Sequence, residues 1–219
     1  MNVSVVLPSF NRARLLPITI PTYFQEDVSE VILVDDCSSD NTAEVVKELQ
    51  TRFPTLRYFR NEVNSKQPYT QNVAISKVQS EYIYFGDDDS VLYPGSIRNL
   101  LNVMREKNAD IVGGRALALF FPEQIDELDE FLSHYRNRIA TEANQIVDLS
   151  TLSTNFTYTV KEPIRVPFCH ASCLCKTQVA REMQFDVKIE GNAYREETDF
   201  LIRATLAGYT IYYTSSANQ

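Results

Sequence analysis

Three consecutive aspartates, Asp87, Asp88 and Asp89, follow an apolar run at residues 82–85, separated from it by Gly86. Like charges held this close repel one another, and a divalent cation is a simple means of stabilising them at neutral pH. In an extended segment, Asp87 and Asp89 would point to one side and Asp88 to the other. Such a pair of hard oxygen ligands suits Mg or Mn, which keep open positions for diphosphate oxygens. The alternative is a solvated acidic turn that caps the helix expected near Pro94.

Two further acidic pairs lie at the expected ends of strands or helices. Asp35-Asp36 ends a second apolar run, and carboxylates placed there either cap the next helix or accept hydrogen bonds from a base or ribose. Glu196-Glu197 begins an expected helix, where the helix dipole favours negative charge even without a catalytic role. Asp199 precedes Arg203 by four residues, which predicts a structural ion pair on the same helix.

The rare residues exclude several kinds of site. The 219 residues include six Gly, and they form no glycine-rich phosphate loop of the Rossmann or P-loop type. Only two His occur, His134 and His170, so an H-E-x-x-H zinc site is excluded. Acid and base chemistry must therefore fall mainly to carboxylates. The net charge of -8 argues against nucleic acid and anionic membrane surfaces as partners, because both require a basic surface.

One cluster resembles a metal site without matching one. Cys169, His170, Cys173 and Cys175 have spacings that fit no common zinc motif, whereas residues 168–175 alternate as a buried strand should. We therefore interpret the cysteines as core residues. His134 lies on the polar side of an acidic amphipathic helix predicted at residues 122–139 and is expected to be solvated.

Apolar runs alternate with helical periodicity in the first half of the chain. The pattern predicts strands at residues 3–7, 31–34, 56–59 and 82–85, and helices at 12–24, 41–52 and 67–78. Pro17 and Pro21 should shorten or kink the first helix, and Asn41 with Glu44 resembles a helix-capping signature. Alternating strands and helices predict a parallel sheet with helices on both faces. Ligands bind beyond the carboxyl ends of such strands, which selects residues 8–11, 35–37 and 86–90.

The second half is less regular. It predicts strands at residues 110–119, 168–175 and 209–214, and helices at 97–104, 122–139, 176–183 and 196–207. Residues 140–167 show no clear pattern, and a stretch of this length is often functional or mobile. The sequence contains no apolar run long enough for a transmembrane helix and no signal peptide at its start. A cytosolic protein with reduced cysteines is therefore expected.

Four motifs occur in a fixed order: VSVVLPSFN at 3–11, VILVDDCSSDNT at 31–42, YIYFGDDD at 82–89 and YREETDFLIRA at 194–204. Together they resemble the inverting nucleotide-sugar glycosyltransferases of glycosyltransferase family 2, over nearly the whole chain. The resemblance implies the α/β GT-A fold, a Rossmann-like and mostly parallel central sheet with helices on both faces. It implies a single domain over residues 1–219, with a nucleotide-sugar-binding half at 1–110 and a smaller acceptor-binding half at 111–219.

The resemblance also implies site residues. Glu197 would be the catalytic base, with Glu196 beside it and Asp199 as a competitor for the role. Asp89, together with Asp87, would hold Mg or Mn, and His170 would face the acceptor side. The implied nucleotide-binding residues are Pro8, Ser9, Phe10, Asn11, Asp36, Lys66, Asp87 and Asp88, with Asp36 on the base.

The implied reaction is a single displacement. The base removes a proton from an acceptor hydroxyl, and the oxygen attacks the anomeric carbon of a nucleotide-diphosphate sugar, expected to be UDP-linked, with inversion. The acceptor would be a glycan, a lipid-linked saccharide or another hydroxyl compound, handled in the cytoplasm or peripherally at the cytoplasmic face of a membrane. Gln71 replaces an arginine that family members often use for the diphosphate, which leaves Arg12 and Lys66 as substitutes. A histidine that often lies near the metal would fall beyond Gln219, as in a chain that continues past this residue.

Two other functions remain open from the sequence. A nucleotidyltransferase that makes nucleotide sugars would also place acidic residues at strand ends, but it normally needs a Gly-rich basic loop where residues 9–14 contain no Gly. A non-catalytic nucleotide-sugar-binding module would keep Asp36 and the three aspartates but tolerate the loss of Glu197.

Overall fold

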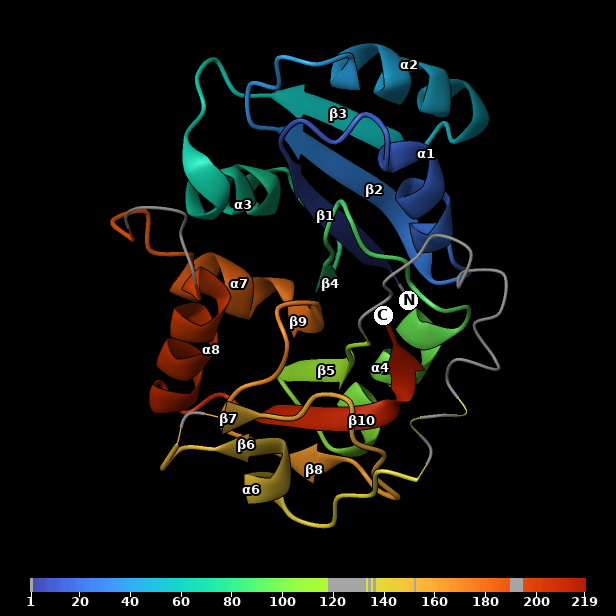
Figure 1. The fold of residues 1–219 in the computed structure, drawn as a ribbon. Helices are drawn as coiled ribbons and strands as arrows, with labels where there is room; N and C mark the ends of the chain where they lie inside the picture. Colours follow the sequence, from blue (N-terminus) through green and yellow to red (C-terminus); the bar gives the residue numbers. More distant parts are fainter. Residues whose placement is uncertain (1, 118–132, 134, 136, 152, 190–194) are drawn as a thin grey trace.

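The computed structural model describes residues 2–117, 133, 135, 137–151, 153–189 and 195–219. A single eight-stranded sheet runs through these residues in the order β3-β2-β1-β4-β9-β5-β10-β8 (Figure 1). The predicted α/β architecture with a mostly parallel central sheet is therefore confirmed. Among the described residues, no helix has both the length and the apolar character needed to cross a membrane.

The first four strands form the parallel half of the sheet. They are β1 (Val3–Ser9), β2 (Val28–Asp35), β3 (Leu56–Arg60) and β4 (Tyr82–Phe85), all close to their predicted positions. Their side chains are apolar on both faces, since Val5 and Leu7 pack on one side of the sheet and Val6 packs on the other. Burial on both faces is the reason that these strands show continuous apolar runs in the sequence.

Helices cover both faces, as predicted. One face carries α1 (Leu16–Thr19), the 3-10 helix η1 (Ile20–Tyr23), α2 (Thr42–Arg52) and α4 (Ser96–Glu106), and the other carries α3 (Lys66–Lys77), α7 (Thr177–Met183) and α8 (Glu196–Leu206). Pro17 and Pro21 each occupy the start of a short helix, which confirms the predicted interruption. Asn41 is the N-cap residue of α2, as predicted, but its side chain makes no capping bond, and Asp40 instead accepts from the amide and hydroxyl of Thr42.

The second half extends the same sheet. β9 (Cys173–Lys176) lies antiparallel between β4 and β5 (Ile111–Arg115), and β10 (Ile211–Asn218) pairs parallel with β5 and antiparallel with β8 (Ile164–Arg165). A separate two-stranded sheet joins β6 (Val147–Asp148) to β7 (Ser153–Thr154) after α6 (Ala143–Ile146). The sheet thus becomes mixed where the chain returns to its centre.

Three predictions of secondary structure need correction or fall outside the described residues. The strand expected at 168–175 begins only at Cys173, because the preceding five residues form a loop over β5. The strand expected at 110–119 ends at Arg115. The acidic helix expected at 122–139, with His134, lies mostly outside the described residues.

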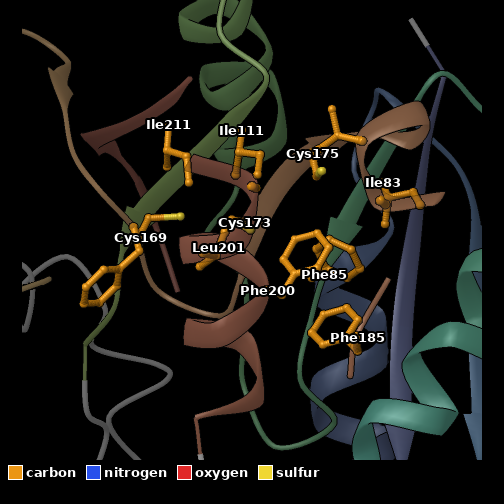
Figure 2. Packing of buried hydrophobic residues seen from close by; sticks show 14 of the residues in the cluster. Ile83, Phe85, Ile111, Cys169, Cys173, Cys175, Phe185, Phe200, Leu201 and Ile211 are labelled. Carbon is orange, nitrogen blue, oxygen red and sulfur yellow. The ribbon is translucent and has the colours of Figure 1, made fainter. Parts of the chain in front are cut away.

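The cysteines of the second half lie in the apolar core. Figure 2 shows Cys169, Cys173 and Cys175 among the aliphatic and aromatic side chains that join β4, β5 and β9 to α8. Phe185 and Phe200 stack there with ring centroids 4.7 Å apart. Burial raises the pKa of the Cys175 thiol, which keeps it protonated and unreactive.

Candidate active site

The carboxyl ends of β1, β2 and β4 meet at one edge of the sheet, because these strands are adjacent and parallel. Backbone hydrogen bonds keep the following loops against β1: the Asp36 amide donates to the Ser9 carbonyl over 2.8 Å, and the Gly86 amide donates to the Val6 carbonyl over 3.0 Å. Phe10 projects at this edge with 43% of its surface exposed. The edge therefore gathers the predicted nucleotide-site residues Pro8, Ser9, Phe10, Asn11, Asp36, Asp87 and Asp88, together with Asp89.

The three aspartates lie on a turn and not on an extended strand. The Tyr23 hydroxyl donates to the Asp87 carbonyl over 2.8 Å, and the Thr19 hydroxyl donates to the Asp88 carbonyl over 3.0 Å. A Cβ at Gly86 would lie 2.9 Å from Cε1 of Tyr23, so only glycine lets the ring approach this closely. The side-to-side alternation expected of an extended segment therefore does not apply here.

Asp87 points into the protein. Its Oδ2 accepts hydrogen bonds from the Ser172 hydroxyl over 2.7 Å and from Nε2 of Gln219 over 3.1 Å. The other end of the Gln219 amide accepts from the Tyr84 hydroxyl over 2.5 Å. Burial raises the pKa of the Asp87 carboxyl, and the Ser172 hydroxyl and the nearby His170 oppose this shift. Asp87 is thus held by Ser172, which precedes β9, and by Gln219, which follows β10. Gln219 is in turn held by Tyr84 on β4.

Asp88 and Asp89 lie beside the guanidinium group of Arg12. Nε of Arg12 lies 3.4 Å from Oδ1 of Asp88, and its Nη2 lies 3.5 Å from Oδ2 of Asp89. Burial raises the pKa of Asp88 to about 6, and Arg12 opposes the shift while the two neighbouring carboxylates add to it. The Asp89 side chain is 49% exposed and is the most accessible carboxylate of the turn.

The chemistry of the turn fits a divalent cation held jointly by protein and ligand. Within the described part of the chain, no group of three or more His, Cys, Asp or Glu side chains converges into a complete cage. Mg commonly uses one or two carboxylates together with substrate phosphates, and an exposed Asp89 beside other carboxylates matches that donor set. A cation here would also relieve the mutual repulsion that raises the pKa of Asp88.

Asp36 organises the start of α3. Its Oδ1 accepts from Nδ2 of Asn61 and from the Ser65 amide, each over 2.8 Å, and its Oδ2 accepts from the Lys66 amide over 2.8 Å. Lys66 itself has a left-handed conformation, with a φ of 71°. The side chain is buried, with 4% exposure. Asp36 therefore ties the end of β2 to the first turn of a helix at the candidate nucleotide site.

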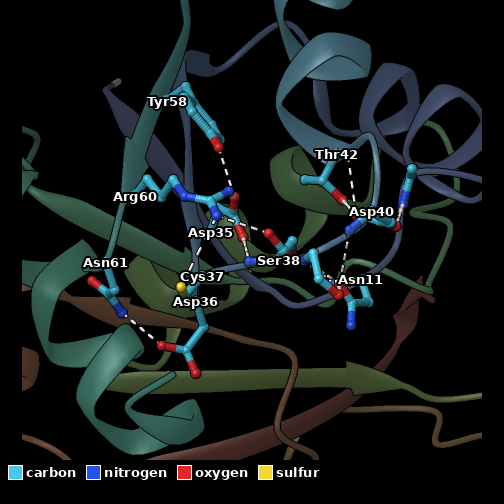
Figure 3. A network of polar contacts seen from close by, with 12 residues as sticks. Asn11, Asp35, Asp36, Cys37, Ser38, Asp40, Thr42, Tyr58, Arg60 and Asn61 are labelled. Carbon is cyan, nitrogen blue, oxygen red and sulfur yellow. Dashed lines mark hydrogen bonds and ion pairs between the residues drawn. The ribbon is translucent and has the colours of Figure 1, made fainter. Parts of the chain in front are cut away.

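Asp35, the last residue of β2 and the neighbour of Asp36 in the sequence, has a structural role. Its Oδ1 accepts from the Ser38 amide over 2.8 Å, and its Oδ2 accepts from the Tyr58 hydroxyl and from Nη1 of Arg60 (Figure 3). Burial and this bond raise the pKa of Tyr58 to about 12, so the phenol remains a donor. Arg60 also donates to the Ser38 carbonyl over 2.8 Å. These bonds fix the loop that presents Asp36.

Asn11 fixes the neighbouring loop. Its amide donates to the Ser38 hydroxyl over 2.8 Å, and its Oδ1 accepts from the Ser39 amide over 2.8 Å and from the Asp40 amide (Figure 3). Its φ of 56° is a conformation that asparagine adopts more readily than most residues. Asn11 thus joins the loops that follow β1 and β2.

The structure distinguishes the two substitutes for the missing arginine. Arg12 lies against Asp88 and Asp89, whereas Lys66 is an exposed residue at the start of α3. Gln71, which replaces the arginine, is buried, and its Oε1 has no hydrogen-bond partner in the described part of the chain. Arg12 is therefore the cation that the fold already places at the aspartate turn.

Glu196 and Glu197 occupy the first turn of α8, after Arg195 in a left-handed conformation with a φ of 66°. Glu196 is buried, with 5% exposure, whereas Glu197 is partly exposed. Burial raises the pKa of Glu196 to about 8, and the charges of Glu197 and Asp87 add to the shift. The fold therefore brings the predicted catalytic pair into the electrostatic field of the aspartate turn.

Asp199 is engaged elsewhere, as predicted. Its Oδ2 accepts from Nε of Arg203 over 2.8 Å, one helical turn later. Arg203 also donates to the carbonyls of Met183 and Gln184, each over 2.7 Å. This ion pair therefore anchors α8 to the end of α7.

His170 lies between the carboxylates and a cavity. Its Nδ1 accepts from the Ser172 amide over 3.2 Å, and its ring contacts Phe156 edge to face with centroids 5.9 Å apart. Burial lowers the pKa of His170, while the charges of Asp87 and Glu197 oppose the shift. The cavity has a volume of about 330 Å³ and is lined by Ser90, Ala116, Leu117, Phe156, His170 and Gln219.

A reciprocal pair of hydrogen bonds joins the two halves of the chain. Nδ2 of Asn72 donates to the Phe185 carbonyl over 2.9 Å, and Oδ1 of Asn72 accepts from the Phe185 amide over 2.8 Å. Asn72 lies on α3, whose first turn is held by Asp36, and Phe185 precedes the segment leading to α8. The donor-side helix is therefore attached to the chain that carries the glutamates.

Sequence reasoning missed Tyr23, Asn61, Ser172 and Gln219. Each is an isolated polar residue whose partner lies far away in the sequence, such as Tyr23 and Asp87 at a separation of 64. No local pattern marks such residues, because their role comes from contacts that form only in the folded chain.

Comparison with known proteins identifies the same family as the four sequence motifs. The profile of Glycosyl transferase family 2 matches residues 4–173. A GalNAc(5)-diNAcBac-PP-undecaprenol beta-1,3-glucosyltransferase of Campylobacter jejuni is 33% identical over 114 residues, which cover 51% of this chain and 37% of the relative. Poly(ribitol-phosphate) beta-N-acetylglucosaminyltransferase TarP of Staphylococcus aureus is 32% identical over 121 residues, covering 52% and 36%. The chain thus spans little more than a third of the length of these curated relatives.

Solved structures share the fold across nearly the whole chain. S. aureus TarS in complex with UDP superposes with a TM-score of 0.70 at 19% identity, covering 100% of this chain and 60% of that chain. A mannosyltransferase from Pyrobaculum calidifontis in complex with GDP-Man and Mn²⁺ gives 0.66 at 16% identity, covering 99% and 56%. The fold is therefore the GT-A fold. Since the family profile also matches most of the sequence, the chain belongs to glycosyltransferase family 2.

Proposed function

We propose that this chain transfers a sugar from a nucleotide diphosphate donor, most simply a UDP-sugar, to an acceptor hydroxyl with inversion. The observation that carries the proposal is the gathering of Phe10, Asp36 and the aspartate turn at the carboxyl ends of the adjacent parallel strands β1, β2 and β4. A base on α8 near a turn suited to a metal and diphosphate is the arrangement that a single displacement needs. The UDP and UDP-GlcNAc complexes of the structural relative TarS support the choice of nucleotide.

Glu197 is the better candidate for the base. A carboxyl with a pKa of about 8, such as Glu196, holds its proton at neutral pH and is not ready to accept another. Glu197 is more exposed on the same helical turn and can meet an incoming hydroxyl. In the proposed step the hydroxyl proton passes to Glu197 while the oxygen bonds to the anomeric carbon. The bond from that carbon to the diphosphate oxygen breaks at the same time.

The aspartate turn would hold the diphosphate end of the donor. Asp89, with Asp87 behind it, would bind Mg or Mn, and the cation would stabilise the negative charge of the departing diphosphate. Arg12 is placed to pair with a phosphate once a metal has taken its position at the carboxylates. Pro8, Phe10 and Asp36 would border the nucleoside, with Lys66 at its edge.

The acceptor would be a glycan or a lipid-linked saccharide. The Campylobacter jejuni relative acts, by its name, on a saccharide linked to undecaprenol diphosphate, and the TarP and TarS relatives on poly(ribitol phosphate). By analogy we place this activity in the cytoplasm, at the cytoplasmic face of a membrane where such acceptors are presented.

A thermal-shift panel tests the proposal. Nucleoside mono- and diphosphates and nucleotide sugars are compared with and without Mn, because a ligand that binds only the native state raises the melting temperature. UDP and UDP-sugars should stabilise the protein, and Mn should increase the effect. If no nucleoside diphosphate shifts the melting temperature at millimolar concentration with Mn present, the proposal is wrong.

A further inference from the structure

The cavity beside His170 has the size and lining of a small-ligand site. Its volume of about 330 Å³ lies within the usual range for ligand pockets. Leu117 and Phe156 give it an apolar side, and Ser90 and His170 give it a polar side. Gln219 also borders the cavity, but its amide is already bonded to Asp87 and Tyr84. His170 is therefore the polar ring that the cavity offers to an occupant.

The hydrogen bond at Nδ1 fixes the form of the ring. Nδ1 of His170 accepts from the Ser172 amide, so it carries no proton, and the neutral ring must carry its proton on Nε2. Burial favours this neutral ring. Among the residues that the structure describes, Nε2 has no acceptor within hydrogen-bond distance, while the ring itself lines the cavity. The Nε2–H group of His170 is thus a fixed and uncharged hydrogen-bond donor at the cavity.

We propose that His170 is a specificity-determining residue that donates from Nε2 to an oxygen of a sugar ring bound in this cavity. The inference rests on the proposed function, since the ring is that of either the donor or the acceptor. A pyranose has the matching chemistry, because its C–H face can lie against Phe156 while its hydroxyl oxygens accept hydrogen bonds. The negative charges of Asp87 and Glu197 act on His170, so a sugar ring bound to it would lie within the electrostatic influence of the candidate base.

Two substitutions of His170 by an amide side chain distinguish the hydrogen-bond donor at Nε2 from the contact between Nδ1 and the Ser172 amide. In His170→Gln the side-chain amide nitrogen can occupy the position of Nε2, but the acceptor for the Ser172 amide is lost. In His170→Asn the amide oxygen can replace Nδ1 and keep the loop contact, but no group reaches the position of Nε2. A role in sugar recognition therefore predicts that Asn is the more damaging change, whereas a purely structural role predicts that Gln is.

The first arm of the test measures donors. Isothermal titration with Mn gives the affinity ratio of UDP-GlcNAc to UDP for the native protein and both variants. If the ring belongs to the donor, His170→Asn lowers this ratio by about five- to tenfold while His170→Gln stays within about twofold of the native value. Affinity of the native protein for UDP reports separately on the proposed function. If UDP does not bind, that function is wrong, whereas UDP binding with an unchanged ratio in both variants counts only against donor recognition by His170.

The second arm measures acceptors. Saturation-transfer NMR with a panel of monosaccharides, in the presence of UDP and Mn, detects a ring bound without a donor sugar. If the ring belongs to the acceptor, the native protein and His170→Gln give a signal with at least one monosaccharide and His170→Asn gives none. The inference is overturned if the two variants behave alike in both arms, or if His170→Gln is the weaker binder.

Discussion

Gln219 donates a hydrogen bond to the carboxylate of Asp87 over 3.1 Å across a sequence separation of 132 residues. The same amide donates to the Ser172 hydroxyl and accepts from Tyr84, so it connects β4, β10 and the loop before β9. Asp87 therefore depends for its position on a residue that belongs to no motif.

Replacing this amide by a carboxylate should disturb the turn. Gln219→Glu keeps the acceptor for Tyr84 but removes the donor to Asp87 and adds a like charge beside it. We expect a loss of stability of about 1–3 kcal/mol, because a buried carboxylate loses a donor. Affinity for UDP should fall as well. Chemical denaturation and titration calorimetry measure the two effects, with Gln178→Glu at an exposed position of α7 as the control for added charge. Equal behaviour of the two variants would contradict the positioning role.

Glu197→Gln should abolish transfer while UDP binding is retained. The amide has nearly the same shape but cannot accept the proton of the acceptor hydroxyl, and loss of a general base typically costs about 10²–10⁴-fold in rate. Release of UDP from UDP-sugars with water as the acceptor provides an assay that needs no known acceptor. Glu196→Gln is the matched control and should retain a larger share of the activity. Undiminished turnover in Glu197→Gln would exclude this residue as the base.

Glu196 should make stability depend on pH. Its folded pKa of about 8 lies above its ordinary value of 4.5, so the folded state favours the protonated form. The contribution is fully present below about pH 4.5 and is lost as the pH rises through 8. Unfolding free energies measured from pH 5 to 9 should therefore fall more steeply for the native protein than for Glu196→Gln. Parallel curves would show that Glu196 is not the group responsible.

Asp89→Asn should reduce metal-dependent nucleotide binding. The change removes the most exposed carboxylate of the turn, and the amide is a poorer ligand for Mg or Mn. Calorimetry should show UDP affinity that increases with Mn in the native protein and responds much less in the variant. Asp148→Asn, a change at a partly exposed position of β6, should leave the response intact. Equally tight UDP binding with and without Mn in the native protein would remove the metal from the proposal.

Gly113→Ala should strain the loop that carries His170 and Ser172. A Cβ at this position would lie 2.7 Å from Sγ of Cys169, and overpacking of this kind typically costs about 1–3 kcal/mol. The loss should be largely reversed in the double variant Gly113→Ala/Cys169→Gly, which removes the Cβ and Sγ atoms that the new methyl group would meet. Denaturation of the four proteins in this cycle gives the coupling, and simple additivity would show that the two residues do not share the space.

The sequence predicted the regular elements well because their burial is recorded in local patterns. Strands such as β2 and β4 are apolar on both faces, so their runs are continuous, and Pro17 and Pro21 mark the interruption between α1 and η1. The motifs that resemble the family identified the carboxylates of the candidate site for a similar reason, since each of these carboxylates follows a strand or begins a helix.

Contacts between distant segments could be predicted less well from the sequence. The loop at 168–172 alternates like a strand, but it leaves the sheet and packs Cys169 over Gly113, where the absence of a side chain admits it. Asn41 holds the N-cap position of α2, but the side-chain bonds there come from Asp40, which accepts from the amide and hydroxyl of Thr42. Such outcomes depend on competition between partners that only the folded chain brings together.

The insertion of β9 between β4 and β5 makes the two halves of the chain mutually dependent for solubility. Removing residues after 110 would leave β4 with one side of its backbone unpaired, at the edge of a parallel sheet whose faces are apolar. An edge of this kind invites pairing with other chains and aggregation. A donor-binding fragment ending there should therefore precipitate when expressed alone and be rescued by co-expression of the remaining residues.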